Sequence, residues 1–213
     1  MPTKLRTLAM TTCLGLASIQ SASAVTLFKD YVHGAPIGKF TGATGFYDCS
    51  NPEQQGRCRD NVDFLGEKFT AVLVFREDRL DQVALVAPYR QDLYPKVSDA
   101  LAKSFNIISL ENQASSLDMV TLRNKATQDE YVQKFMAFES AALAQGDLTY
   151  TYLEVPETVG YQDAQALLAA SPEDVRLAAV RVFKDNESAN LVVRFELPNV
   201  NLQHLKDEPD EAF

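Results

Sequence analysis

The pattern of apolar and polar positions first marks two β-hairpins. Residues 68–76 and 80–86 are rich in β-branched and aliphatic side chains and are separated by three polar residues. A second pair of such runs lies within 175–198, around a polar turn at 184–187. Apolar β-type runs that flank a short polar turn are typical of antiparallel hairpins, so the chain is expected to contain two of them.

Helical spacing follows in three further segments. Apolar residues recur every three or four positions within 90–106, 127–146 and 161–170, which predicts three helices. The segment 127–146 is the clearest, because Thr127 and Glu130 have the spacing of a capping box at its start.

The remaining segments carry weaker signals. Residues 25–34 place apolar side chains on one face before Gly34, which predicts a short helix. Residues 107–110 and 117–123 are expected to be strands, and 147–155 alternates as a strand does. Tyr150 and Tyr152 share one face of that strand, where they form either a stacking platform or a core layer against the aromatic residues of 127–146.

A short sequence match links the two hairpins. Residues 71–77 read AVLVFRE and residues 179–185 read AVRVFKD. Duplication of a hairpin-plus-helix unit would produce this match, and so would two half-buried strands that reached the same apolar pattern independently.

Together these elements predict an α+β fold. We expect a mostly antiparallel sheet with two β-hairpins, and two to three amphipathic helices packed on it, because hairpins dominate over strand–helix–strand alternation. No biased linker divides the chain, so residues 25–205 are expected to form a single domain, followed by a mobile acidic tail at 206–213.

The first 24 residues have the features of a signal peptide. Lys4 and Arg6 precede an uncharged stretch at 8–19, and the small-x-small site at 22–24 predicts a mature start near Val25. The stretch is too short for a transmembrane anchor, which needs about 20 apolar residues. Cys13 raises a lipid-attachment alternative, but it lies inside the apolar run and not at its end.

Composition and charge narrow the function classes. Apolar residues make up 46% of the 213, and the formal charge is −9. Removal of residues 1–24 would take away two basic side chains and no acidic one, which leaves 18 basic against 29 acidic residues and a charge of −11. Nucleic-acid binding needs an excess of basic residues, so no nucleic-acid partner is expected. No later segment is apolar enough to anchor the mature chain in a membrane.

The cysteine count supports export. Cys49 and Cys58 are the pair that remains after residue 24, and an even pair in an exported chain predicts a disulfide. The loop between them would present Asn51, Glu53, Gln54 and Arg57 as a possible binding surface. A metal pair or a redox dithiol is the alternative, but the spacing is not that of a Cys-x-x-Cys motif.

Few residues of the sequence are candidates for catalysis. His33 and His204 are the two histidines, and His33 precedes a glycine-rich loop that could hold it beside a cleft. The sequence contains none of the nucleophile, phosphate-loop or zinc motifs, and an exposed histidine is the simpler interpretation of His33. We therefore assign no catalytic residue, metal or cofactor, and keep His33 as a candidate polar site.

These observations predict a non-catalytic exported protein, periplasmic or extracellular, that binds another exported protein or a small ligand. One alternative is an inhibitor of a basic hydrolase such as lysozyme, since an acidic protein would attract a cationic enzyme. The other alternative is a hydrolase that works through carboxylates and His33.

Overall fold

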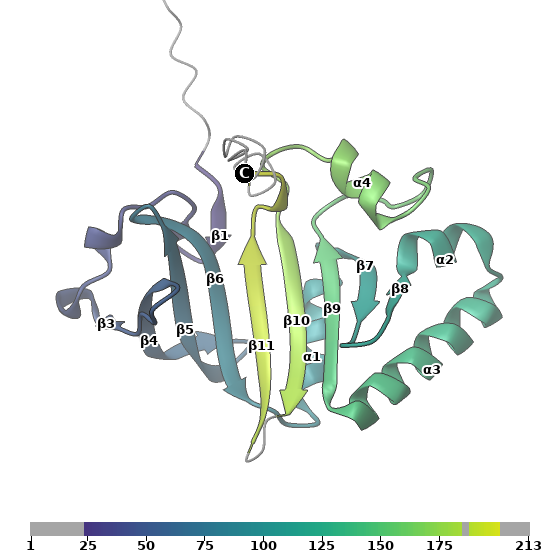
Figure 1. Ribbon diagram of the computed structural model, residues 1–213, viewed down its shortest axis with the longest axis horizontal. Coiled ribbons are helices and arrows are strands. Elements are labelled where there is room, and N and C mark those ends of the chain that lie inside the picture. Colours follow the sequence, from purple (N-terminus) through teal and green to yellow (C-terminus); the bar gives the residue numbers. More distant parts are fainter. Residues whose placement is uncertain (1–23, 185–187, 201–213) are drawn as a thin grey trace, which may run out of the picture.

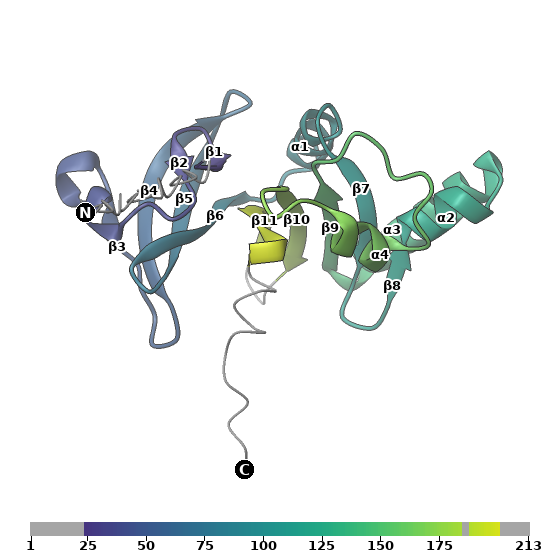
Figure 2. The ribbon, with the colours of Figure 1, turned by 90° about the horizontal axis from the view of Figure 1, so that it is seen from above.

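A nine-stranded antiparallel sheet forms the centre of the computed structural model, which describes residues 24–184 and 188–200 (Figures 1 and 2). Its strand order is β3-β4-β5-β6-β11-β10-β9-β7-β8. The strands are β3 (Tyr47–Asp48), β4 (Gln55–Phe64), β5 (Glu67–Arg76), β6 (Arg79–Pro88), β7 (Asn106–Glu111), β8 (Ser116–Asp118), β9 (Asp147–Leu153), β10 (Leu177–Lys184) and β11 (Ala189–Glu196). The predicted α+β class with a mostly antiparallel sheet is confirmed.

Four α-helices lie within the described ranges. They are α1 (Leu93–Leu101), α2 (Met119–Lys125), α3 (Gln128–Gln145) and α4 (Ala164–Ala170). The described residues therefore contain at least one helix more than the two to three expected. The extra helix is α2, which replaces most of the strand predicted at 117–123, because the Asp118 carboxylate accepts a hydrogen bond from the backbone nitrogen of Thr121 and caps a helix there.

The N-terminal prediction was wrong. Residues 25–34 form no helix but a small hairpin of β1 (Thr26–Phe28) and β2 (Tyr31–Val32). Its apolar side chains Leu27, Phe28 and Tyr31 are buried against the sheet, so tertiary packing overrides the helical spacing of this segment. Figure 2 shows this hairpin and α1 on the same side of the sheet.

Strand β4 had no sequence signal of its own. It is polar along most of its length and carries the irregular register between Arg59 and Val62. Pairing with β5 holds it in the sheet through backbone hydrogen bonds, which do not depend on side-chain polarity.

Both predicted hairpins are present, as β5–β6 and as β10–β11, and β6 pairs with β11 to join them. One row of opposed side chains crosses six strands on the inner face of the sheet. Each member is 0% exposed: Leu110, Tyr150, Val180, Val193, Leu85 and Ala71. This row is the centre of the core onto which α1, α3 and the β1–β2 hairpin pack.

The matching segments 71–77 and 179–185 of the two hairpins do not occupy equivalent positions in the sheet. Ala71 of β5 lies in the inner row opposite Leu85, whereas its sequence counterpart Ala179 lies on the other face, and Val180 takes the inner position. A shift of one residue reverses the face of every side chain in a strand. The match therefore records two strands of similar composition and not two equivalent strands.

Several predictions concern residues that the structure does not describe. The predicted signal peptide at 1–24, apart from Ala24, lies outside the described ranges, as do His204 and the predicted acidic tail at 206–213. Within the described part, no helix is long and apolar enough to cross a membrane.

Candidate functional site

A pocket with four aromatic side chains in its lining lies between α1, α2, α3 and the strands β7 and β9. Its volume is about 400 Å³. Figure 2 shows α1 on one side of β7 and α2 and α3 on the other. Its apolar lining consists of Ala102, Phe105, Ile107, Tyr131, Phe135 and Tyr152, and its polar lining of Ser98, Asp99, Asn106 and Arg123. We call this the aromatic pocket.

Helix α3 supplies one wall and is held by local sequence signals. The Thr127 hydroxyl accepts from the backbone nitrogen of Glu130, whose carboxylate accepts from the backbone nitrogen of Thr127, so the predicted capping box is confirmed. Gly146 ends the helix with a φ of 79°, a conformation that glycine adopts without steric cost. Tyr131 and Phe135 lie one turn apart on this helix and both reach the pocket.

A partly buried hydrogen-bond network fixes α3 against α1 and β9. Glu139 Oε1 accepts hydrogen bonds from the hydroxyls of Tyr94 and Tyr150, at 2.9 and 2.5 Å. Burial raises the pKa of both tyrosines above the ordinary value, so both hydroxyls stay protonated as donors. The network anchors the helix on the sheet beside the pocket.

The tyrosines of β9 were predicted either as a platform or as core. Tyr150 is fully buried, and its ring packs 6.5 Å from that of Phe135 on α3 and 5.1 Å from that of Tyr94 on α1. The core interpretation is therefore confirmed for Tyr150. Tyr152, at 5% exposure, is also buried but forms part of the pocket wall, and burial raises its pKa.

Arg123 on α2 brings a positive charge to this apolar pocket. Its Nη1 donates to Thr158 Oγ1 at 3.0 Å and to Asn106 Oδ1 at 3.4 Å, and its guanidinium lies 6.0 Å from the centre of the Tyr131 ring. Thr158 is buried, and the Asn106 amide donates to the carbonyl of Val155 at 2.7 Å, so both acceptors are fixed. Arg123 was not among the predicted site residues.

A signal for Arg123 exists in the sequence. Asp118 and Thr121 have the spacing of a helix N-cap, and this cap makes α2 and directs Arg123 toward the pocket. Asp118 also accepts from the backbone nitrogen of Ala164 at the start of α4, so one carboxylate holds both helices. The apolar residues that follow Asp118 favour a strand, so the helix N-cap at Asp118 was not predicted.

The predicted disulfide is present between Cys49 and Cys58, with a Cα–Cα distance of 5.8 Å. Gly56 lies beneath it, and a β-carbon there would come within 3.2 Å of the Cys49 carbonyl oxygen. In the loop, Asn51, Glu53 and Gln54 are exposed.

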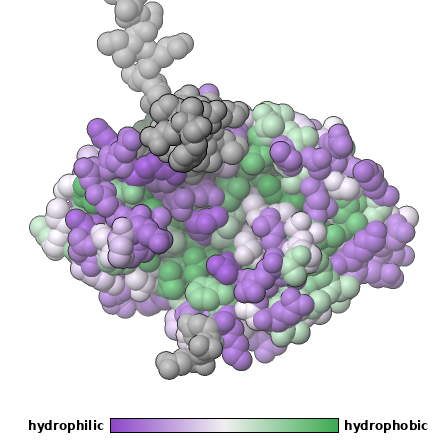
Figure 3. Space-filling model, viewed as in Figure 1, coloured by the Kyte–Doolittle hydropathy of each residue, from purple (hydrophilic) through white to green (hydrophobic). Residues whose placement is uncertain are grey.

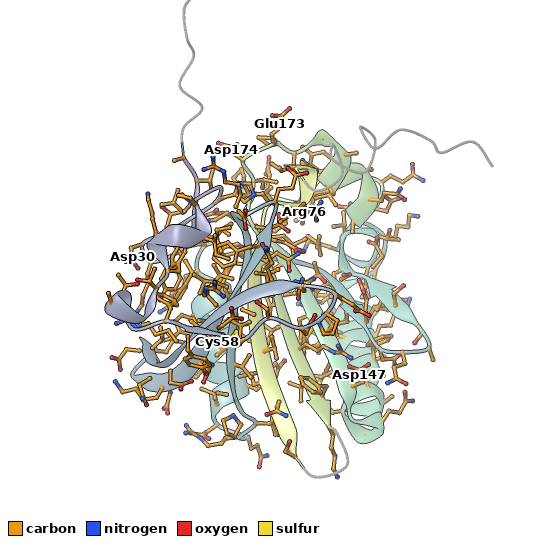
Figure 4. The ribbon with its side chains drawn as sticks, turned by 60° about the vertical axis from the view of Figure 1, so that its left-hand side comes forward. Asp30, Cys58, Arg76, Asp147, Glu173 and Asp174 are labelled. Carbon is orange, nitrogen blue, oxygen red and sulfur yellow. A yellow bond between two sulfur atoms is a disulfide. The ribbon has the colours of Figure 1, made fainter. Side chains whose placement is uncertain are left out.

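The fourth predicted loop residue, Arg57, is half-buried and forms an ion pair with Asp48 at 2.5 Å. The loop is thus closed and ordered by its own contacts, and Arg57 is engaged within it. Figure 4 shows Cys58 on β4 at the side of the sheet away from α3.

His33 lies far from the aromatic pocket, next to a buried aspartate. Its Nε2 is 3.8 Å from Asp81 Oδ1, and Arg76 Nη2 is 3.5 Å from Asp81 Oδ2. A general base needs a hollow beside it that holds the substrate. His33 lines neither the aromatic pocket nor the groove on the other face of the sheet, which is described below.

The other face of the sheet, which we call the open face, presents apolar side chains that the described residues leave half-exposed. Val72, Val74, Ala84, Val86 and Val192 form its centre. Figure 3 shows this green area in the middle of the molecule with hydrophilic residues around it. Cys58, Arg76 and Asp147, labelled in Figure 4, mark three points around its edge.

A groove of about 370 Å³ runs along the open face over β10 and β11. Its two arginines are already paired, Arg181 with Asp147 at 3.0 Å and Arg194 with Glu196 at 3.3 Å. The groove is therefore more polar and more fully charge-balanced than the aromatic pocket.

Comparison with known proteins gives no assignment. Within the described ranges, no group of three or more histidine, cysteine or acidic side chains is placed to hold a metal ion. No protein-family model, no curated protein sequence and no solved structure matches the chain.

Proposed function

We propose that the protein is an exported, non-catalytic binding protein that holds a small apolar ligand in the aromatic pocket. The observation that carries this proposal is a hollow of about 400 Å³ lined by six apolar or aromatic residues, with four polar residues beside them. Pockets for small molecules have this size and composition.

Export is supported by the Cys49–Cys58 disulfide, because disulfides form and persist in oxidising compartments. The sequence features of residues 1–24 agree with it. Both observations favour the periplasm or the extracellular space.

Fluorescence titration of the purified, oxidised protein with N-phenyl-1-naphthylamine tests the proposal. This neutral aromatic probe should gain fluorescence with one saturable site, and Phe135→Ala should weaken its binding about tenfold, because Phe135 lines the pocket.

Met136→Ala is the matched control, since Met136 is the next residue of α3, is 57% exposed and does not line the pocket. Thermal unfolding of both variants checks that the fold is retained. Absence of saturable binding, or equal weakening by both substitutions, would contradict the proposal.

The lysozyme-inhibitor hypothesis is a second candidate, favoured by the disulfide-closed loop with its exposed Asn51, Glu53 and Gln54. Addition of the protein in micromolar excess at low salt should slow lysozyme if the hypothesis holds, and Glu53→Lys should weaken the effect. Unchanged lysozyme activity would remove this candidate.

A further inference from the structure

We propose that the aromatic pocket selects amphipathic carboxylates, that is, ligands with one carboxylate on an aromatic or aliphatic body, and that Arg123 binds the carboxylate. This inference rests on the proposed function, since it names the ligand class of the same pocket. The two statements are separable, because an apolar pocket can bind neutral molecules without any contribution from Arg123.

The hydrogen bonds of Arg123 leave part of its guanidinium available. A guanidinium has five N–H donors, and both bonds of Arg123 to described residues come from Nη1. Nε and Nη2 therefore have no partner within the described part of the chain. These two nitrogens form the planar edge that binds a carboxylate through two parallel hydrogen bonds.

The acceptors that hold Arg123 are both neutral. Thr158 provides a hydroxyl and Asn106 an amide oxygen, so neither cancels the positive charge. Arg181 and Arg194 on the open face differ, because each lies within 3.3 Å of a carboxylate oxygen. Arg123 forms no ion pair with any residue of 24–184 or 188–200.

The position of Arg123 matches the shape of such a ligand. The guanidinium is exposed to solvent, whereas Phe105 and Tyr152 are buried in the wall of the same pocket. A ligand that reaches these rings with its apolar body would place an acidic head group beside Arg123. The fixed acceptors reduce the conformational entropy that Arg123 loses on binding.

Asp99 on α1 also lines the pocket and limits the charge that the pocket accepts. Its carboxylate repels a second negative charge, so a monoanion fits better than a dianion. Asp99→Asn should therefore strengthen binding of an apolar carboxylate about two- to threefold, a modest effect because Asp99 is exposed.

Isothermal titration with 1-naphthaleneacetate and its neutral isostere 1-naphthaleneacetamide tests the inference on the purified, oxidised protein. The acetate should bind about tenfold more tightly than the amide, since a hydrogen bond between charged groups contributes more than one between neutral groups. Arg123→Gln should abolish this preference by weakening only the acetate, and Arg123→Lys should retain part of it.

Arg59→Gln is the matched control. Arg59 is also exposed, lies 5.7 Å from the centre of the Phe46 ring and forms no ion pair with a described residue, but it is remote from the pocket. This variant should keep the full preference for the acetate.

The outcomes separate the two proposals. Equal affinity of wild-type protein for acetate and amide, or a preference that survives Arg123→Gln, would overturn the carboxylate inference while the pocket remains a binding site. If the protein binds none of 1-naphthaleneacetate, 1-naphthaleneacetamide and N-phenyl-1-naphthylamine, the proposed function and this inference are both overturned.

Discussion

Tyr150 on β9 donates a hydrogen bond of 2.5 Å to Glu139 on α3, and this bond joins the longest helix to the centre of the sheet. Tyr94, which is half-buried, donates to the same carboxylate oxygen, so one side chain accepts from two hydroxyls. Removal of the carboxylate leaves both hydroxyls without this acceptor, and Tyr150 is fully buried.

Glu139→Ala is therefore expected to lower the free energy of unfolding by about 2–3 kcal/mol. Urea unfolding followed by circular dichroism measures it. Ser140→Ala, at the next and exposed position of α3, should change stability by less than about 0.5 kcal/mol. Equal effects of the two substitutions would show that Glu139 contributes no more than an exposed helix residue.

The two faces of β11 should differ in their tolerance of substitution. Val193 is 0% exposed in the inner row, whereas its neighbour Val192 is half-exposed on the open face. Val193→Ala should cost about 2 kcal/mol of stability, from lost burial and from the cavity left behind. Val192→Ala should cost less than about 1 kcal/mol. A cost for Val192 as large as that for Val193 would mean that the open face is covered in solution.

Glu196 should make stability depend on pH in a direction opposite to that of most carboxylates. Burial raises its pKa above the ordinary value of 4.5, Asp81 raises it further, and Arg194 partly offsets the rise. A raised pKa means that the folded state favours the protonated carboxyl. The stabilising contribution is therefore complete below pH 4.5 and is lost as the pH rises through the folded-state pKa.

Glu196→Gln removes this titration. The variant should gain stability relative to wild type as the pH rises above 4.5, and the two should converge at lower pH. Thermal unfolding across pH 3.5–8 measures the difference. A difference that stays constant with pH would exclude a raised pKa.

Reduction of the Cys49–Cys58 disulfide should destabilise the protein. Opening a ring of this size costs about 2–3 kcal/mol in the chain-entropy model. Urea unfolding with and without reductant measures the loss, and a Cys49→Ser/Cys58→Ser variant should match the reduced protein and be insensitive to reductant. Unchanged stability on reduction would show that the loop is held by its other contacts.

The turn between β5 and β6 offers a stabilising substitution. Glu77 and Asp78 both have positive φ, at 50° and 59°, which side chains other than glycine and asparagine adopt at a steric cost. Replacing the pair by Asn-Gly should raise the free energy of unfolding by about 1 kcal/mol without affecting ligand binding. The same replacement of the exposed pair Gln128-Asp129, in the first turn of α3, should lower the free energy of unfolding, because asparagine and glycine are poor helix formers.

Much of the fold could be predicted because local signals agreed with the final contacts. Helix α3 carries its own cap and stop, at Thr127 and Gly146, and the β5–β6 hairpin has apolar runs around a polar turn. The cysteine pair followed from the count of cysteines and the expectation of export.

The sequence-based predictions were wrong where tertiary contacts outweighed local conformational preference. Residues 25–34 have helical spacing but pack as a hairpin, and β4 is polar but pairs with β5. The aromatic pocket was missed because its walls come from five separate elements. Tyr152 and Arg123 lie 29 positions apart in the chain, and no sequence spacing brings them together.

The sequence by itself determined the α+β class, the two hairpins, the disulfide and the limits of α3, because each depends on interactions between residues close in the chain. Only the tertiary structure decided the order of nine strands, the face on which each side chain lies and the meeting of Arg123 with the aromatic rings. The physical reason is that strand pairing uses backbone groups common to all residues, while a one-residue shift in register reverses which side chains meet.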